Sequence, residues 1–420
     1  MNGYKTTVGI EVHAELKTKS KMFCGCTNDP HAADANANVC PVCMAHPGTL
    51  PVVNKEAVHL LMQIGTAVGG TLAEYSEFDR KNYFYPDIPK AYQISQYEFP
   101  FVSGGELAGV ALTRIHLEED TARSQHDDTA GKSYVDYNRA GVPLMELVTE
   151  PVIHDAESAG KFARELQLLL RTMNASDANM ERGEMRVEAN ISVSKTEELG
   201  TKVEVKNLNS FKSVEGAIDY EVKRQIEMIE KGEAVIQETL GWDENKGKTF
   251  SQRVKESADD YRYFPDPDIP KFKRSEIPEF SESSLAEISA ETPENKRVFY
   301  RDIGLTSDQI EIIITDNVRD SFVKETLKTL SDKKEIATMA NYFTSDVLGI
   351  CEAQERTLEG AHPREFADLI ALVVAGDLNS RVAKDLLQEA VFEGLSPKDM
   401  AEKRGLIQKN SEDDLIPIVD

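Results

Sequence analysis

Three segments in the first half of the chain alternate between apolar and other residues. In residues 7–16, TVGIEVHAEL, every second side chain is apolar, whereas Glu11 and His13 share the opposite side. Residues 185–194, MRVEANISVS, and residues 201–208, TKVEVKNL, follow the same pattern. A period of two is typical of a β-strand that buries one face. We therefore predict an antiparallel sheet that is covered on one side and exposes polar side chains on the other.

Helices are predicted between these strands. Residues 54–69, with Asn54 as N-cap, and residues 155–174 and 210–232 carry apolar residues with helical spacing. Strands interspersed with helices predict an α+β domain over residues 1–290. From about residue 291 the alternation disappears and charged helical segments such as EFADLIALVVAG follow. We therefore predict a mainly helical region over residues 291–420.

Length and composition indicate a soluble globular protein with two or three domains. The chain has 420 residues, of which 40% are apolar and 29% are charged. Its apolar runs are far shorter than the roughly 20 residues of a membrane helix. The first residues, MNGYKTTVGIEV, lack the apolar core of a secretory signal. We therefore expect a cytoplasmic protein that does not bind a membrane, in which clustered cysteines bind metal rather than form disulfides.

Four of the five cysteines lie within residues 24–43, CGCTNDPHAADANANVCPVC. Two close pairs of thiolates suit a tetrahedral zinc ion, and we predict that Cys24, Cys26, Cys40 and Cys43 bind one. A site with four thiolates leaves no open position for a substrate, so the zinc would be structural. The alternatives are a redox-active dithiol in CPVC, for which no thioredoxin-like context is visible, and thiols without metal.

Two possible phosphate-binding motifs fail on their spacing. GKS at 131–133 and GKT at 247–249 lack the glycine that a P-loop places five residues earlier.

A more promising pattern is a set of dispersed acids with one imidazole. Its members are Glu11 and His13, then Glu118, Glu119 and Asp120 in RIHLEED, and Glu146 and Glu150 in VPLMELVTEP. Such ligands suit Mg²⁺ or Mn²⁺, and the alternative is ordinary solvated acids with an edge histidine.

The formal net charge of −25 works against any general attraction of nucleic acid. Binding of RNA would need a local basic patch, a shape contact or the charge of a partner. Arg80, Lys81 and Lys90 lie among aromatic residues in FDRKNYFYPDIPKAYQ, and Arg139 lies in DYNRAGVP. Basic side chains beside such turns are candidate phosphate contacts, with surface salt bridges as the alternative.

One short peptide, PDIPK, occurs twice, at residues 86–90 and 267–271. Each copy follows a cluster of Tyr and Phe, in NYFYPDIPK and in YRYFPDPDIPK. Two copies of five residues are too short to indicate a repeat architecture. The simplest interpretation is that aromatic and proline residues stiffen a turn in both places.

Several of these segments together resemble one known family. VDYNRAGVPLMELVTEP (135–151), FDRKNYFYPDIPKAYQISQ (78–96) and DDYRYFPDPDIP (259–270) are similar to the blocks of the GatB family, the B subunit of the glutamyl/aspartyl-tRNA amidotransferase. GIEVHAEL, RIHLEED and VEVKNLNSF are similar as well, in the same order. The resemblance implies a cradle-shaped α+β domain, a helical domain and a YqeY-like tail. We assign these to residues 1–290, 291–355 and 356–420, and expect the tail to be a shortened one.

The resemblance also implies an activity. Members of the family use ATP and Mg²⁺ to phosphorylate the side-chain carboxylate of Glu-tRNA(Gln) or Asp-tRNA(Asn), and ammonia then displaces the phosphate. The A component of the amidotransferase, a glutaminase, releases the ammonia from glutamine, and the small C component wraps the pair. The chain shows no Ser-Ser-Lys amidase pattern, which agrees with ammonia arriving from a partner.

Site residues follow from the resemblance by position. Those that match the metal ligands of the family are Glu11, His13, Glu119 and Glu146. Glu188 matches a further acid, at the metal or at the mouth of an ammonia channel, and Lys81, Lys90 and Arg139 are expected at the phosphates. Two other functions remain possible, a non-catalytic tRNA-binding scaffold and a zinc-stabilised phosphate-ester hydrolase.

Overall fold

The structure is a computed structural model that describes residues 3–32, 34–127, 129–254, 261–281, 283–285 and 291–408. The chain divides into two compact units, Met1–Ala290 and Glu291–Asp420. The first unit combines a large sheet with helices, and the described residues of the second are helical apart from their connections. The α+β class predicted for the first part and the helical character predicted for the second are confirmed.

The first unit is built on one large sheet. Within the described residues its strand order is β15-β14-β13-β12-β1-β11-β8-β6-β2, with β7 paired to β8. The pairs are antiparallel except for β13 and β14, which run parallel. The long strands are β1 (Lys5–Glu15), β8 (Val110–Glu119), β11 (Pro143–Thr149), β12 (Met185–Ser194), β13 (Val203–Leu208), β14 (Glu238–Asp243) and β15 (Lys248–Val254). The short ones are β2 (Thr71–Leu72), β6 (Val102–Ser103) and β7 (Glu106–Leu107).

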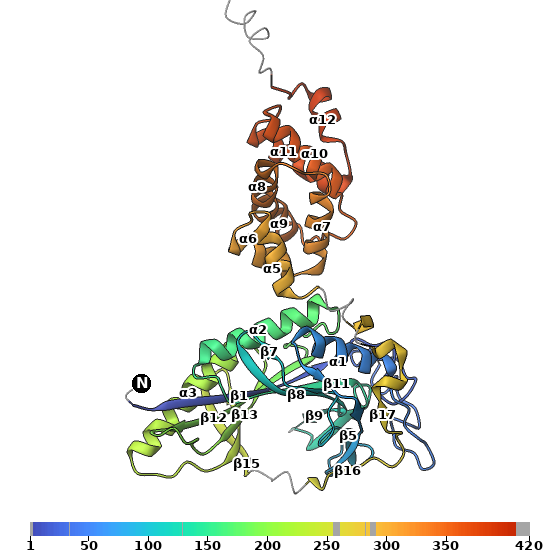
Figure 1. The fold of residues 1–420 in the computed structure, drawn as a ribbon, viewed down its shortest axis with the longest axis vertical. Helices are drawn as coiled ribbons and strands as arrows, with labels where there is room; N and C mark the ends of the chain where they lie inside the picture. Colours follow the sequence, from blue (N-terminus) through green and yellow to red (C-terminus); the bar gives the residue numbers. More distant parts are fainter. Residues whose placement is uncertain are drawn as a thin grey trace, which may run out of the picture. The chain divides into compact units, whose positions relative to one another are not determined.

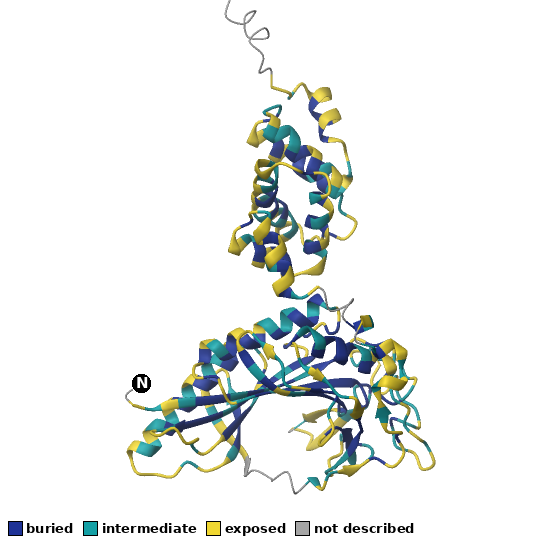
Figure 2. Cartoon of the chain, in the orientation of Figure 1, coloured by how far each residue is buried: buried dark blue, intermediate teal, exposed yellow. Residues whose placement is uncertain are grey.

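Helices cover one face of this sheet. They are α1 (Lys55–Ala67), α2 (Ala156–Thr172) and α3 (Phe211–Glu230), and all three lie on the same side in Figure 1. Asn54, Asp155 and Ser210 cap them by accepting hydrogen bonds from backbone N–H groups, and the sequence predicted the cap at Asn54 and the starts of the other two helices. Figure 2 shows that buried residues concentrate in the layer between the helices and the sheet. The opposite, concave face of the sheet carries the polar side chains.

Smaller sheets flank the concave face. β4 (Asp79–Asn82) pairs with β5 (Tyr92–Ser95) and with β16 (Phe264–Pro265). β9 (Arg123–Asp127) and β10 (Lys132–Asp136) form a hairpin, and β3 (Tyr75–Ser76) pairs with β17 (Phe272–Lys273). Two 3₁₀ turns follow, η2 (Arg274–Glu276) and η3 (Pro278–Phe280). These elements bring residues 78–96 and 261–273 together, although the two segments are remote in the sequence.

The second unit packs short helices around its own core, which includes Phe343, Phe366 and Leu386. Its helices are α5 (Pro293–Asp302), α6 (Ser307–Ile314), α7 (Asn317–Leu327), α8 (Lys333–Tyr342), α9 (Leu348–Ala353), α10 (Pro363–Ala375), α11 (Ser380–Glu393) and α12 (Pro397–Arg404), with a π-helical turn, η4 (Phe343–Val347). The subdivision of this region near residue 355 stays a prediction. Among the described residues, no helix is long and apolar enough to cross a membrane.

Candidate functional site

Three central strands place acids and histidines side by side on the concave face. In the β1–β11 pair His13 lies opposite Glu146, and in the β11–β8 pair Glu146 lies opposite His116. Directly opposed residues of an antiparallel pair project from the same face of a sheet. The alternation that buries Val12 in the helix-covered layer therefore sends His13 to the concave side.

His13 is the centre of this group. Its Nε2 atom lies 3.4 Å from Glu146 Oε2, 3.5 Å from Glu118 Oε1 and 3.9 Å from Glu11 Oε1. We call Glu11, His13, Glu118 and Glu146 the carboxylate cluster. Glu146 also contacts a second imidazole, since its Oε2 atom lies 3.3 Å from His116 Nε2. Ligand atoms of His13, Glu118 and Glu146 lie within 4.8 Å of one another, as do those of Glu11, His13 and Glu188, so either group could hold a metal ion.

The cluster crowds several negative charges around one imidazole. Burial raises the pKa of Glu11 to about 7, and the carboxylates of Glu146 and Glu188 add to the shift. Burial lowers the pKa of His13, but hydrogen bonding and attraction to Glu146 outweigh it and raise that pKa to about 9. Burial also raises the pKa of Glu146, while His116 and His13 pull it well below its usual range. Crowded carboxylates beside one imidazole fit a hard divalent cation.

The prediction grouped Glu119, rather than Glu118, with Glu11, His13 and Glu146. The structure brings Glu118 to His13 and places Glu119 elsewhere. Glu119 Oε2 accepts a hydrogen bond from Lys90 Nζ at 2.6 Å, and its Oε1 accepts one from the Ile94 backbone N–H at 3.0 Å. Successive residues of a strand point to opposite faces, so neighbouring glutamates at the end of β8 serve different surroundings.

Sequence reasoning treated Glu118 only as one acid of RIHLEED and did not select His116 at all. A signal for both is present in the alternation of that segment. Ile115 and Leu117 are fully buried, and Glu119 continues their side of the strand. His116 and Glu118 therefore share the other side, the side of His13.

Glu188 lies at the edge of the carboxylate cluster. It is opposite Glu11 in the β1–β12 pair. Lys206 Nζ on β13 donates a hydrogen bond to Glu188 Oε2 at 2.5 Å, and Lys206 also lies 3.9 Å from Glu204. The charge of Glu188 is thus partly offset by a direct partner.

The three basic residues expected at phosphates have different surroundings. Lys81 Nζ lies 5.0 Å from the centre of the Tyr261 ring and 5.7 Å from that of Tyr83. Burial lowers the pKa of Lys81, but attraction to Glu118, together with weaker contributions from other groups, raises it well above its usual range. Lys81 is therefore expected to stay protonated at neutral pH.

Lys90 and Arg139 are bound to protein groups instead. Lys90 is paired with Glu119, as described above. The guanidinium of Arg139 donates hydrogen bonds to the backbone carbonyls of Thr121 and Ala122, at 3.0 and 3.1 Å, and lies 3.8 Å from Asp120. Arg139 thus fixes a loop, whereas Lys90 would have to leave Glu119 to meet a phosphate.

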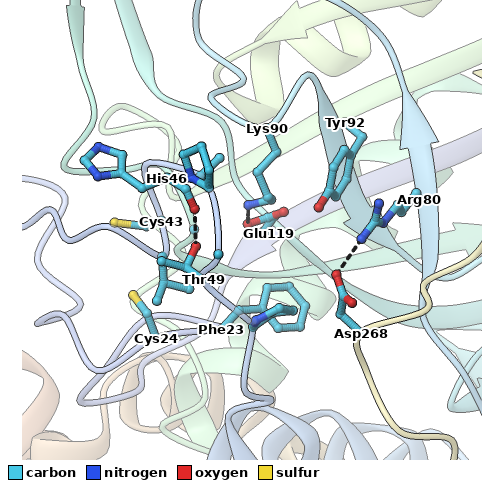
Figure 3. Close-up of a pocket in the computed structure, with 16 residues that line it drawn as sticks. Phe23, Cys24, Cys43, His46, Thr49, Arg80, Lys90, Tyr92, Glu119 and Asp268 are labelled. Atoms are coloured by element: carbon cyan, nitrogen blue, oxygen red, sulfur yellow. Dashed lines mark hydrogen bonds and ion pairs between the residues drawn. The ribbon is translucent and has the colours of Figure 1, made fainter.

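A pocket of about 300 Å³ opens beside Lys90 and Glu119. Figure 3 shows Lys90, Glu119, Tyr92 and Arg80 along one side of it and Cys24 and Cys43 along another. Arg80 is held by Asp266 and Asp268, with N···O distances of 2.7 and 2.8 Å, and its guanidinium lies 4.3 Å from the centre of the Tyr92 ring. The pocket therefore offers charged and aromatic walls.

The four clustered cysteines converge as a zinc site requires. Their sulfur atoms lie within 4.8 Å of one another, and those of Cys40 and Cys43 are 3.9 Å apart. Tetrahedral zinc–thiolate bonds of about 2.3 Å place sulfurs about 3.8 Å apart. A hydrogen bond from Cys24, with help from Lys21, lowers the pKa of Cys43 to about 5 despite burial. The donor set therefore fits a structural zinc ion.

The loop between the two cysteine pairs is fastened to residues 135–141. The Asn38 backbone N–H donates to Asn138 Oδ1 at 2.8 Å, and Asn138 Nδ2 donates to the Asp34 carbonyl at 2.8 Å. The Asn36 backbone N–H donates to Asp136 Oδ1 at 2.9 Å. Since Cys24 and Cys43 line the pocket, the cysteine loop is one of its walls and not a remote element.

Comparisons with known proteins agree along the chain. A family model described as "GatB/GatE catalytic domain" matches residues 6–277, and a second, described as "GatB domain", matches residues 321–420. A Brevibacillus brevis protein is 40% identical over 100% of this chain and 89% of its own length. A Thermus thermophilus protein is 42% identical over 96% of this chain and 86% of its own length. Both are named as the B subunit of an aspartyl/glutamyl-tRNA(Asn/Gln) amidotransferase.

Proposed function

The chain belongs to the GatB family, the B subunits of aspartyl/glutamyl-tRNA(Asn/Gln) amidotransferases, and on that premise we propose that it activates a carboxylate for amidation. An amidotransferase forms a carbon–nitrogen bond, so the chain is a component of a ligase. The proposed substrate is the side chain of Glu or Asp attached to a misacylated tRNA(Gln) or tRNA(Asn). Its carboxylate oxygen attacks the γ-phosphorus of ATP and ADP leaves. Ammonia then attacks the acyl carbon and phosphate leaves.

The observation that carries this proposal is the convergence of three carboxylates on His13. Transfer of a phosphoryl group to a carboxylate brings anions together, and catalysis depends on offsetting that charge. His13, Glu118 and Glu146 would hold Mg²⁺, with Glu11, 3.9 Å from His13, as a further ligand, and the ion would supply positive charge to the phosphate oxygens. In this set Glu118 takes the place of Glu119, which the sequence had suggested, because of the geometry of β8.

Lys81 is proposed as the phosphate contact closest to this cluster. Its ammonium lies against Tyr83 and Tyr261, and its pKa is raised by Glu118, so it keeps its charge at neutral pH. A fixed ammonium lowers the energy of charge that develops on a transferring phosphoryl group.

Lys90, Arg139 and Glu188 are proposed for supporting roles. Lys90 lines the pocket. It is proposed to break its ion pair with Glu119 and to bind a phosphate there instead. Arg139 is proposed to act through the loop whose carbonyls it binds. Glu188, held by Lys206, is proposed at the rim of the metal site or at the entry of ammonia.

The proposed partners are the A component of the amidotransferase, which is the glutaminase that releases ammonia, the C component, and the misacylated tRNA. The four cysteines are proposed to bind a structural zinc ion, and the cytoplasm is the proposed location.

A non-catalytic scaffold is disfavoured by the converging acids, since an unused cluster of buried charges costs stability. A phosphate-ester hydrolase remains the less supported alternative.

The test is an assay of the reconstituted complex. Purified chain with the A and C components should convert ATP, glutamine and Glu-tRNA(Gln) or Asp-tRNA(Asn) into ADP and the amidated tRNA. Assay of both tRNAs under the same conditions identifies the substrate. A complex that assembles and binds tRNA but forms no ADP with either substrate would contradict the proposal and support a scaffold.

A further inference from the structure

The two copies of PDIPK in the sequence belong to segments that meet in space. β16 pairs with β4, with Phe264 opposite Arg80 and Pro265 opposite Asp79. The aromatic clusters that precede the two copies therefore lie side by side, although residues 83 and 261 are remote in sequence. The proposed phosphorylation does not use these rings, apart from the contact of two of them with Lys81.

Five tyrosines from three segments form one continuous row. Tyr85 and Tyr83 have ring centres 6.0 Å apart, and Tyr83 lies 5.8 Å from Tyr261. Tyr261 lies 6.3 Å from Tyr263, whose ring is stacked on Tyr97 at 4.5 Å with an angle of 14° between the planes. We call these residues the tyrosine row. Contacts between neighbouring rings hold the row together.

Both ends of the tyrosine row are open to solvent. Tyr85 is 50% exposed and Tyr97 is 51% exposed, and the neighbouring Phe84 is 75% exposed. Large exposed aromatic side chains that lie together mark a binding surface rather than a folding core. A flat ring with a free face can stack on a nucleobase without any requirement for charge.

The middle of the row adjoins the carboxylate cluster. Lys81 lies over the rings of Tyr83 and Tyr261. Its strand, β4, pairs with β5, from which the Ser95 hydroxyl donates a hydrogen bond to Glu118 Oε2 at 3.1 Å. The Tyr83 hydroxyl also donates to Gln93 Oε1 at 3.1 Å, and Gln93 Nε2 donates to the Glu119 carbonyl at 2.7 Å. The row therefore connects the surface to the end of β8 that carries Glu118.

We propose that the tyrosine row is the stacking surface for the unpaired 3′ end of the aminoacyl-tRNA. The inference rests on the proposed function, in which the reacting carboxylate belongs to an amino acid esterified to the terminal nucleotide. When that carboxylate lies at the carboxylate cluster, only a few bonds separate it from the terminal ribose, so the last bases must lie beside the cluster. Proteins commonly bind unpaired RNA ends by stacking bases on aromatic side chains.

Charge favours the same occupant. With a net charge of −25 the chain is poorly suited to holding an RNA end by its phosphates alone. Stacking avoids this difficulty, because a base presents an uncharged ring. The row also presents an exposed ring at each end, Tyr85 and Tyr97, which suits separate bases of a single strand.

The experiment measures binding of two hairpin RNAs by the complex with the A and C components. Both reproduce the tRNA acceptor stem, and one lacks the unpaired 3′ nucleotides. The wild-type complex should prefer the RNA with the unpaired end. Tyr97→Ala and Tyr85→Ala should each reduce this preference, by roughly tenfold for a lost base stack. Tyr97→Phe should restore it, because the ring and not the hydroxyl makes the contact.

The matched control is Phe250→Ala, which removes an exposed aromatic ring from β15, an edge strand of the large sheet that carries no residue of the row. This variant should keep the full preference, and melting temperatures should show that all variants fold. Tyr97→Ala and Tyr85→Ala proteins that fold and retain the full preference would overturn the inference. So would an increase in the KM for ATP with unchanged RNA binding, because the row would then hold the adenine of ATP. The binding readout does not depend on phosphorylation, so failure of the proposed function would be seen separately, as a wild-type complex that forms no ADP.

Discussion

Glu118 and Glu119 are adjacent in the chain, but their carboxylates project from opposite faces of β8. Glu118 Oε1 lies 3.5 Å from His13 Nε2 within the carboxylate cluster. Glu119 Oε2 lies 2.6 Å from Lys90 Nζ in the neighbouring pocket. A single peptide step thus separates the proposed metal site from a pocket wall, and the two glutamates provide matched variants for testing the assignment.

Glu118→Gln is expected to weaken binding of Mg²⁺ or Mn²⁺ at least tenfold, because it removes a charged ligand from the cluster. Glu119→Gln is the matched control and should change metal affinity much less, because Glu119 is paired with Lys90 and not with the carboxylate cluster. Titration with Mn²⁺, monitored by electron paramagnetic resonance, measures the metal affinity of both variants. The reverse order of effects would show that Glu119 is the ligand and that the assignment from β8 is wrong.

Lys81→Met is expected to lower kcat for ADP formation by roughly 100-fold, as loss of a charge that stabilises a transition state typically does. Lys81→Arg should recover part of the activity, because it keeps the positive charge. Lys5→Met serves as the control, since Lys5 forms an exposed pair with Glu197 at the start of β1. If Lys81→Met and Lys5→Met behaved alike, Lys81 would have no part in phosphoryl transfer.

Cys40→Ser is expected to remove zinc from a protein that otherwise holds about one ion per chain. Loss of a structural metal should lower the melting temperature of the first unit by roughly 10 °C. At temperatures where the variant stays folded, its kcat should stay close to that of the wild type. Metal analysis and calorimetry test this, and a large loss of kcat with zinc and melting temperature unchanged would contradict a structural role.

Asp320→Asn is expected to destabilise the second unit by about 3 kcal/mol, because it leaves a buried ammonium without its partner. Asp320 Oδ2 lies 2.8 Å from Lys296 Nζ, and its Oδ1 accepts a hydrogen bond from Tyr300 at 2.8 Å. The exposed pair of Glu325 and Lys328 provides the control, since Glu325→Gln should cost less than about 1 kcal/mol. Equal destabilisation by both variants in urea titrations would contradict the importance of burial.

The same carboxylate predicts a pH dependence. Burial raises the pKa of Asp320, but hydrogen bonds from Lys296 and Tyr300 outweigh it, so the folded pKa lies below that of the unfolded chain. The stabilisation is therefore complete above about pH 5, where an unfolded aspartate is almost fully ionised, and is lost as the pH falls toward the lower folded pKa. Urea titrations between pH 7 and pH 3 should show a steeper loss in the wild type than in Asp320→Asn. Parallel curves would mean that Asp320 titrates alike in both states.

The parts of the fold that depend on local chemistry could be predicted from the sequence. The caps at Asn54, Asp155 and Ser210 follow from hydrogen bonds within one helical turn. The alternation of residues 7–16 predicted which face of β1 is buried. These features need no information about the rest of the chain.

Features that depend on long-range pairing could not be predicted in the same way. The meeting of His13 and Glu118 depends on the registers of β1 with β11 and of β11 with β8. The commitment of Arg139 to two carbonyl groups depends on how its loop folds back. The pairing of β16 with β4 likewise joins segments whose shared peptide gave no sign of contact.

The most direct test of the proposed phosphorylation follows an oxygen atom of the side-chain carboxylate into the released phosphate. Glu-tRNA(Gln), or Asp-tRNA(Asn) if that is the substrate found, is labelled with ¹⁸O in the side-chain carboxylate and incubated with ATP, glutamine and the full complex. Phosphorylation of the carboxylate predicts that one ¹⁸O per turnover appears in the released phosphate, and that Glu118→Gln lowers both ADP formation and label transfer. Amidated tRNA formed with no ¹⁸O in the phosphate would contradict the central claim that this chain activates the carboxylate by phosphorylation.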